Sequence, residues 1–150
     1  MKYVLGAKCT RCGAEYEALP TITTCKCGGI LDIQYSYSAI RDHFSPADLE
    51  QNHDWSMWRY RPFLPVEEDS PAPPLRVGWS PLYKADRLSK VLGLKTLYIK
   101  DDGQNPTASL KDRASAMAVA KAREAGADTI ACSSTGNDAS SLAGDAAGAG

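Results

Sequence analysis

Apolar and polar positions alternate most regularly in the second half of the chain, from residue 79 onward. The apolar run "TLYIK" at residues 96–100 predicts a buried strand, and a polar loop separates it from "SLKDRASAMAVAKAREAG". Apolar residues recur in this longer segment at three- and four-residue spacing, at Leu110, Ala114, Met117 and Ala118. The spacing predicts an amphipathic helix with these residues on its apolar face, Ser109 at its N-cap and Gly126 at its C-terminal cap.

Two further segments extend this pattern toward the end of the chain. The run "DTIACS" at residues 128–133 predicts a second strand, and "STGND" is a turn before a helix over "ASSLAGDAAGAG". A short helix over "LSKVLGL" ends near Gly93. We therefore expect an α/β fold with parallel strands joined by a right-handed crossover. Parallel sheets are covered by helices on both faces, so we expect the chain to be the N-terminal part of a longer protein.

The first half of the chain divides into two regions of different composition. Residues 1–35 hold two strand-like runs, "AEYEAL" and "GILDIQYSY", the second with alternating apolar and polar residues. Residues 36–78 are rich first in aromatic residues and then in proline, at Pro62, Pro65, Pro71, Pro73 and Pro74. These prolines disfavour a regular helix or a central strand, so this region is predicted to be a connecting arm. The expected organisation is a module over 1–35, an arm over 36–78 and an α/β domain that begins at 79.

Composition and charge are those of an ordinary soluble globular protein. The chain has 150 residues, of which 43% are hydrophobic and 23% charged, and its formal net charge is -1. This balance gives no global electrostatic reason to expect nucleic acid or an anionic membrane as a partner. The sequence has no apolar run of the roughly 20 residues that a membrane span needs, and its N-terminus lacks the apolar core of a signal peptide. We expect a cytoplasmic protein.

Four of the five cysteines cluster near the N-terminus, at Cys9, Cys12, Cys25 and Cys27. They form two close pairs, each followed by glycine, which is typical of a zinc-ribbon-like module in which four thiolates surround one structural Zn²⁺. The second pair has one intervening residue where the usual ribbon has two, so reduced thiols without metal remain the alternative. A zinc ribbon that binds nucleic acid is disfavoured, because residues 1–35 carry few cations.

The segment "NPTASLKDR" places Lys111 in the predicted first turn of a helix, where the helix dipole disfavours a cation. The simplest interpretation is a solvated surface lysine. Lys111 and the loop at residues 134–137 each follow a predicted strand, however, and so lie at the same edge of the predicted sheet. The dipole and nearby Arg113 favour the unprotonated amine, which is the form that reacts with a carbonyl cofactor. The loop offers N–H groups, hydroxyls and the Asn137 amide as a cradle for a carboxylate or phenolate.

Together these residues resemble a known family. "NPTASLKDRAS" followed by "SSTGN" resembles the fold-type II pyridoxal-phosphate (PLP) enzymes, and most of all the threonine synthase family. "WRYRPFLP", "GWSPLYKADRL" and the N-terminal cysteine pattern are also similar to that family. The resemblance implies that Lys111 forms the Schiff base with PLP and moves protons, and that Asn137 binds the ring hydroxyl of the cofactor. It implies that Ser134, Thr135 and Gly136 bind the substrate carboxylate.

The resemblance also implies an activity, that of a PLP-dependent lyase converting O-phosphohomoserine and water to threonine and phosphate. The substrate would be a small amino acid, with no nucleic-acid or membrane partner, and a homodimer is an assembly to consider. A threonine dehydratase or a phosphoserine-using β-replacement synthase would keep both motifs, whereas a purely structural module would need neither. The chain departs from the family pattern at Ser80, Ala108 and Leu110, and Asp138 adds a negative charge beside the carboxylate loop. The family's loop for the cofactor phosphate comes later, so these 150 residues alone are expected to be inactive.

Overall fold

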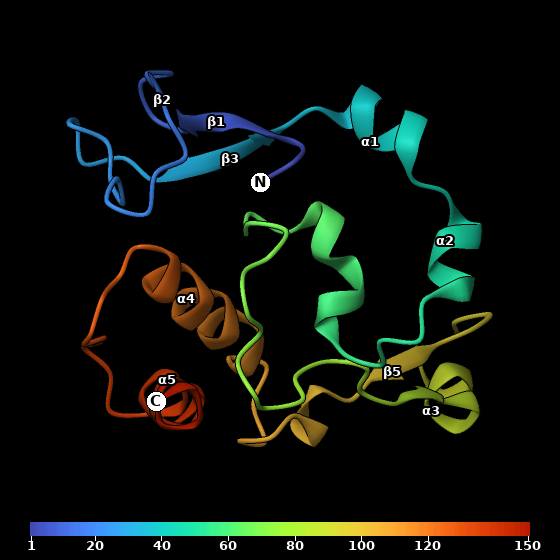
Figure 1. Ribbon diagram of the computed structural model, residues 1–150. Coiled ribbons are helices and arrows are strands. Elements are labelled where there is room, and N and C mark those ends of the chain that lie inside the picture. The colour runs from blue at the N-terminus through green and yellow to red at the C-terminus, as the bar shows by residue number, and fades with distance from the viewer.

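A small antiparallel sheet forms from the first 35 residues of the computed structural model, which describes residues 1–150 (Figure 1). Its strands are β1 (Val4–Cys9), β2 (Glu15–Tyr16) and β3 (Leu31–Tyr35), in the order β2-β1-β3. A Cβ at Gly6 would lie 2.7 Å from the backbone oxygen of Tyr16, so glycine is what permits this close approach of β1 and β2. Both predicted strand-like runs contribute to the sheet, although only two residues of "AEYEAL" are strand.

The arm contains helices that the sequence pattern did not predict. α1 (Tyr37–His43) and α2 (Pro46–Gln51) run along one side of the molecule in Figure 1, between the sheet and the remaining elements. The residues that cap the N-termini of these helices lie before the proline-rich stretch. The hydroxyl of Ser36 accepts a hydrogen bond from the N–H of Ala39, and the Asp48 carboxylate accepts hydrogen bonds from Ser45. The expectation of an arm without a regular helix is therefore wrong before residue 52.

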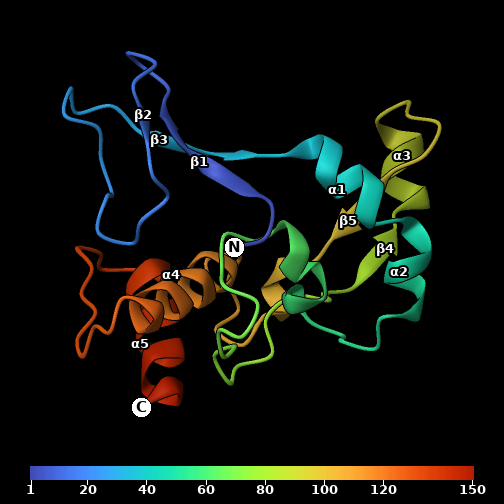
Figure 2. The same cartoon turned by 45° about the horizontal axis from the view of Figure 1, so that its top comes forward.

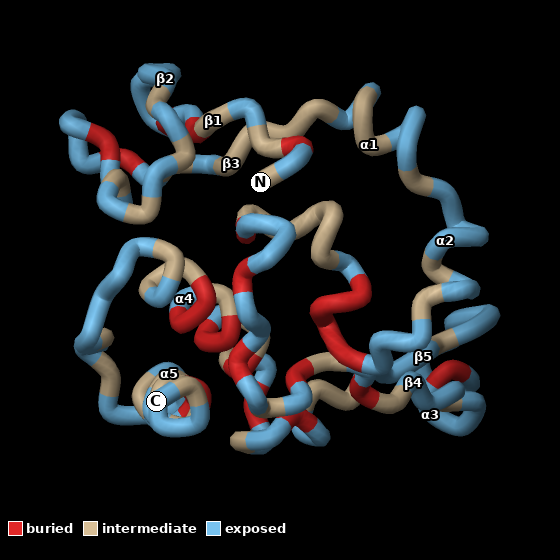
Figure 3. The backbone as a smooth tube through the Cα atoms, in the orientation of Figure 1, coloured by how far each residue is buried: buried red, intermediate tan, exposed pale blue.

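The hydrophobic core lies between the arm and helix α4 (Asp112–Glu124). The arm enters it through η1 (Met57–Phe63), a 3₁₀ helix that is kinked at Tyr60. The buried members of this core are Met57, Trp58, Val66, Val77, Ala116 and Ala120. Figure 3 shows the same distribution, since most buried backbone lies on α4 and on the neighbouring arm segments, and the N-terminal sheet is largely exposed.

Several predicted elements of the second half are present. The helix expected to end near Gly93 is α3 (Asp86–Val91), the strand expected at 96–100 is β5 (Tyr98–Lys100), and the last helix is α5 (Asn137–Ala149). η2 (Asp102–Gln104) lies in the loop before α4. Gly126 ends α4 with φ of 69°, and the N–H of Ala127 returns to the carbonyl of Ala122, which is the expected glycine C-cap.

The predicted parallel strands are wrong for residues 1–150. Residues 128–133 form no strand, and β5 pairs in antiparallel fashion with β4 (Leu82–Lys84), which the sequence pattern did not identify. A strand exists only where a neighbour completes its hydrogen-bond ladder, and no neighbouring strand lies beside residues 128–133. The chain is thus a mixed α/β structure without a parallel sheet. None of its helices has the length and apolarity needed to span a membrane.

The face of α4 that is buried also differs from the prediction. Leu110 is 62% exposed, and Ala114 and Ala118 are exposed. The buried residues on this helix are instead Asp112, Ser115, Ala116, Val119 and Ala120. The buried face includes Ala116 and Ala120, which pack in the core against the arm, so the neighbouring elements determine which face of α4 is covered.

Candidate functional site

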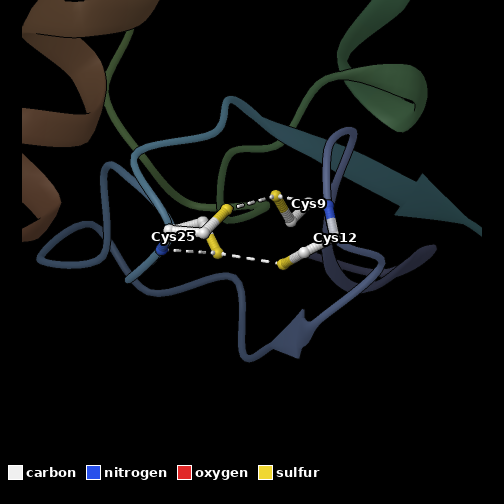
Figure 4. A group of neighbouring side chains, drawn as sticks. Cys9, Cys12 and Cys25 are labelled. Carbon is white, nitrogen blue, oxygen red and sulfur yellow. Dashed lines mark hydrogen bonds between the residues drawn. The ribbon is translucent and has the colours of Figure 1, made fainter.

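The four N-terminal cysteines converge on one point. Their sulfur atoms all lie within 4.8 Å of one another, with 3.6 Å between Cys9 and Cys27 and 3.5 Å between Cys12 and Cys25. Figure 4 shows Cys9 and Cys12 pointing from one loop toward Cys25 on the other. A tetrahedral Zn²⁺ with bonds of about 2.3 Å to sulfur separates its ligand atoms by about 3.8 Å. The cluster therefore has nearly the dimensions of a tetrathiolate zinc site.

The backbone around the cluster is built for this close approach. Gly13 and Gly28 each follow a cysteine pair, and both have φ of 76°, a conformation that favours glycine. A Cβ at Gly29 would lie 2.6 Å from the sulfur of Cys9 and 3.2 Å from that of Cys27. Gly29 thus leaves the space beside these sulfur atoms free of a side chain, and the four cysteines fit a zinc ion.

Hydrogen bonds lower the pKa of two thiols in the cluster, those of Cys9 and Cys25. The hydroxyl of Tyr16 lies 3.1 Å from the sulfur of Cys25, and this contact, with the N–H of Cys27, lowers the pKa of Cys25 to about 6. The same group of thiols raises the pKa of Cys27 to about 12, because its proton is shared with the neighbouring sulfur atoms. A thiolate at Cys25 is the form that binds a metal ion.

Helices α4 and α5 lie side by side (Figures 1 and 2), and an ion pair joins Lys111 to Asp138 at the start of α5. The amine of Lys111 is 2.9 Å from the carboxylate of Asp138, and both side chains are about half exposed. Helix α4 begins at Asp112, so Lys111 occupies its N-cap and not its first turn as predicted. The sequence argument considered the positive charge of Arg113 near Lys111. It did not include Asp138, which is an ion-pair partner of opposite charge.

The loop before α5 presents hydrogen-bond donors beside this lysine. The hydroxyl of Ser134 accepts a bond from the N–H of Gly136, the N-cap of α5, and Asn137 is the first helical residue. The N–H groups of a first helical turn have no carbonyl partner within their own helix. Thr135, Gly136 and Asn137 are exposed, so this end of α5 is open to a carboxylate or phenolate ligand.

A polar network that the sequence analysis did not predict fixes the loop before Lys111. Arg113 donates two hydrogen bonds to Asp102, of 2.9 and 2.8 Å, and the hydroxyl of Ser80 donates a third of 2.5 Å. The Arg113 guanidinium and this hydroxyl hold the pKa of Asp102 well below its usual range. Asn105, which is buried, accepts a bond of 2.9 Å from the N–H of Gly78. Hydrogen bonds therefore join the segment at 78–80 to the segment at 102–113, which contains Lys111.

Ala108 and Asp112 complete the turn into α4. The carboxylate of Asp112 is fully buried and accepts bonds of 2.8 and 2.5 Å from the backbone and the hydroxyl of Thr107. Ala108 has φ of 56°, a conformation that favours glycine, and it stands where the threonine synthase pattern has glycine. The charges of Asp102, Asp112 and Arg113 are visible in the sequence, but they do not reveal which of these groups pair.

Comparison with known proteins shows which family the chain resembles. Residues 74–150 match the family described as pyridoxal-phosphate dependent enzyme. The chain is 43% identical over 136 residues to the threonine synthase of Methanocaldococcus jannaschii and 45% identical over 137 residues to that of Methanosarcina acetivorans. Each match covers 91% of this chain and 33% of the relative, so the chain spans about a third of the length of these relatives. It is 48% identical over 93 residues to the threonine synthase of Halalkalibacterium halodurans, covering 59% of the chain and 26% of that relative. The matched region contains Lys111 and the loop at 134–137, and the chain belongs to the pyridoxal-phosphate dependent enzyme family.

Proposed function

We propose that this chain forms the lysine- and asparagine-bearing part of a threonine synthase, a lyase that converts O-phosphohomoserine and water to threonine and phosphate. The observation that carries the proposal is the 2.9 Å contact between Lys111 and Asp138, which brings the amine to the loop at residues 134–137. Relatives with 43–48% identity that are named threonine synthase support this choice of reaction.

The residues at this end of α4 and α5 fit PLP. PLP, when bound, supplies an electron sink for carbanionic chemistry at the substrate. Lys111 would hold the cofactor through its amine and then move the proton at the substrate α-carbon. Asn137 would orient the ring hydroxyl, and Ser134, Thr135 and Gly136 would bind the substrate carboxylate. The exposure of Lys111 and of the first turn of α5 leaves these groups accessible.

The identity of the substrate is tested in a chimeric protein that has the full length of a relative. Residues 1–150 would be joined to the part of the Methanosarcina acetivorans threonine synthase that they do not match, with that intact relative as control. We expect the chimera to release threonine and phosphate from O-phosphohomoserine, and Lys111→Ala to abolish this activity. Release of a 2-oxo acid from threonine, or replacement chemistry on O-phosphoserine alone, would assign the chain to a dehydratase or a β-replacement synthase instead.

The cysteine cluster adds a structural zinc ion to the proposal. Four protein ligands would complete the coordination of Zn²⁺ and leave no position open for catalysis. The sulfur separations of 3.5 and 3.6 Å and the glycine cradle support zinc over free reduced thiols. Purified protein should contain one zinc per chain, and Cys9→Ser should lose it.

The remaining parts of the proposal concern the setting of the enzyme. A zinc-ribbon protein that binds nucleic acid is less well supported, because the lysine and asparagine loops would then have no role. We place the enzyme in the cytoplasm, with a small-molecule substrate and no nucleic-acid or membrane partner. The homodimer is tested by light scattering of the chimera, where a monomeric mass would exclude it.

A further inference from the structure

The two cysteine loops differ in how their backbones support sulfur. In the first loop, the N–H groups of Arg11 and Cys12 both lie 3.4 Å from the sulfur of Cys9. In the second loop, only one N–H, that of Cys27, contacts the sulfur of Cys25, at 3.5 Å. The sulfur of Cys9 therefore has two backbone N–H groups beside it, and the sulfur of Cys25 has one.

The missing residue of the second loop explains this difference. Gly13 lies four residues after Cys9, and its N–H donates to the Cys9 carbonyl at 3.0 Å. Gly28 makes the same bond to the Cys25 carbonyl, at 2.8 Å, but lies only three residues after its cysteine. The second loop has one residue fewer between its two cysteines. It therefore lacks the N–H group that would be the second donor to the sulfur of Cys25.

The hydroxyl of Tyr16 occupies the place of that donor. It lies 3.1 Å from the sulfur of Cys25, and its oxygen accepts the N–H of Lys26 at 3.1 Å. Since the oxygen already accepts one bond, its proton is free to point at sulfur. A metal-bound thiolate carries no proton and can only accept, so in a zinc-bound cluster the direction of this bond is from Tyr16 to Cys25.

The backbone of Tyr16 is fixed by the sheet and not by the cysteine loops. Tyr16 pairs with Ala7 across β1 and β2, and its carbonyl oxygen lies where a Cβ at Gly6 would clash. The side chain is half-buried. The hydroxyl is therefore held at the second loop by a separate element, which limits the loss of side-chain entropy when the bond forms.

We propose that Tyr16 is a positioning residue for the zinc site, and that its hydroxyl replaces the hydrogen bond that the shortened second loop cannot make. This inference rests on the zinc ion of the proposed function. Four thiolates leave excess negative charge on a Zn²⁺ site, and a hydrogen bond to sulfur reduces it. The same bond orients Cys25 toward the metal despite the short spacing of its pair.

The test compares Tyr16→Phe with the unaltered protein and with Tyr37→Phe. Tyr37 is 70% exposed and makes no contact with sulfur, so its variant controls for the loss of a phenol hydroxyl elsewhere. Zinc affinity is measured by competition with a chromophoric chelator. We expect Tyr16→Phe to weaken zinc binding by about tenfold or more, as for other groups that support metal ligands, and Tyr37→Phe to leave it unchanged.

A second readout separates support of sulfur from a general loss of stability. Co²⁺ bound at saturation in place of zinc gives a sulfur-to-metal charge-transfer band in the near ultraviolet. Without the hydrogen bond the thiolate is more electron-rich, so the band of Tyr16→Phe should move to longer wavelength, while that of Tyr37→Phe should not.

The outcomes distinguish this inference from the zinc proposal itself. If the unaltered protein binds no zinc, both are refuted. If it binds one zinc and Tyr16→Phe has the same affinity and the same cobalt band, the zinc site stands and the role of Tyr16 is refuted. If affinity falls without a shift of the band, Tyr16 stabilises the sheet and does not donate to sulfur, which also overturns the inference.

Discussion

Asp145 on α5 is a buried carboxylate without a hydrogen-bond partner, and its replacement by asparagine gives a quantitative test. The side chain is fully buried, and neither carboxylate oxygen has a hydrogen-bond partner. Burial, together with the negative charge of Asp112, raises the pKa of Asp145 from its ordinary value of 3.8 to about 6. At neutral pH the folded chain therefore holds an ionised carboxylate in an environment that disfavours it.

The cost follows from the two pKa values. A difference of about two between them corresponds to about 3 kcal/mol, since each pKa unit is worth about 1.36 kcal/mol. The folded chain holds this proton more tightly than the unfolded chain, so stability falls as the pH rises from about 4 to about 6 and stays low above that range. Asp145→Asn removes the charge but buries an amide whose unpaired groups cost about 1 kcal/mol or more. We expect a net gain of about 1–2 kcal/mol at pH 7 and no gain at pH 4.

Urea unfolding at pH 7 and pH 4 measures this difference directly. Asp128→Asn is the matched control, because Asp128 is exposed and the same change of charge should leave the free energy of unfolding nearly unaltered at both pH values. The reasoning is refuted if Asp145→Asn has the same effect at pH 7 and pH 4, or if it destabilises the chain at pH 7. Either result would mean that Asp145 is hydrated or paired in solution.

Four other predictions concern the segment around Lys111. Ala108→Gly should stabilise the chain by about 1 kcal/mol in urea, because Ala108 has φ of 56°; a loss of stability would mean that the turn is not strained. Arg113→Lys should cost about 1–2 kcal/mol, because lysine cannot donate both bonds to Asp102. The contribution of Asp102 should be lost only in acid, below pH 4, since its pKa is depressed; loss near neutral pH would contradict the ion pair. The 150 residues alone should show no stable PLP absorbance band, and a band that Lys111→Ala abolishes would contradict this expectation.

The sequence alone was sufficient to predict features that depend only on residues close together in the chain. The glycine that ends α4, the spacing of the cysteines and the order of the later helices are local, because caps and loops form within a few residues. Sequence also placed Lys111 near the loop at 134–137, but by an argument that the structure does not support. The two segments meet because α4 and α5 pack together, since residues 128–133 form no strand that could bring them to one sheet edge.

Tertiary structure alone decided which distant groups become partners. β5 pairs with β4 and not with a parallel strand, and α4 buries a different face from the one expected from its spacing. Arg113 meets Asp102, and Tyr16 meets Cys25, although nothing in either local sequence specifies the pair. The physical reason is that strand pairing, helix packing and the pairing of buried charges each need a partner from a distant part of the sequence. Helix caps and tight turns are set by neighbouring residues, whereas strands and buried contacts form only where another part of the chain supplies a partner.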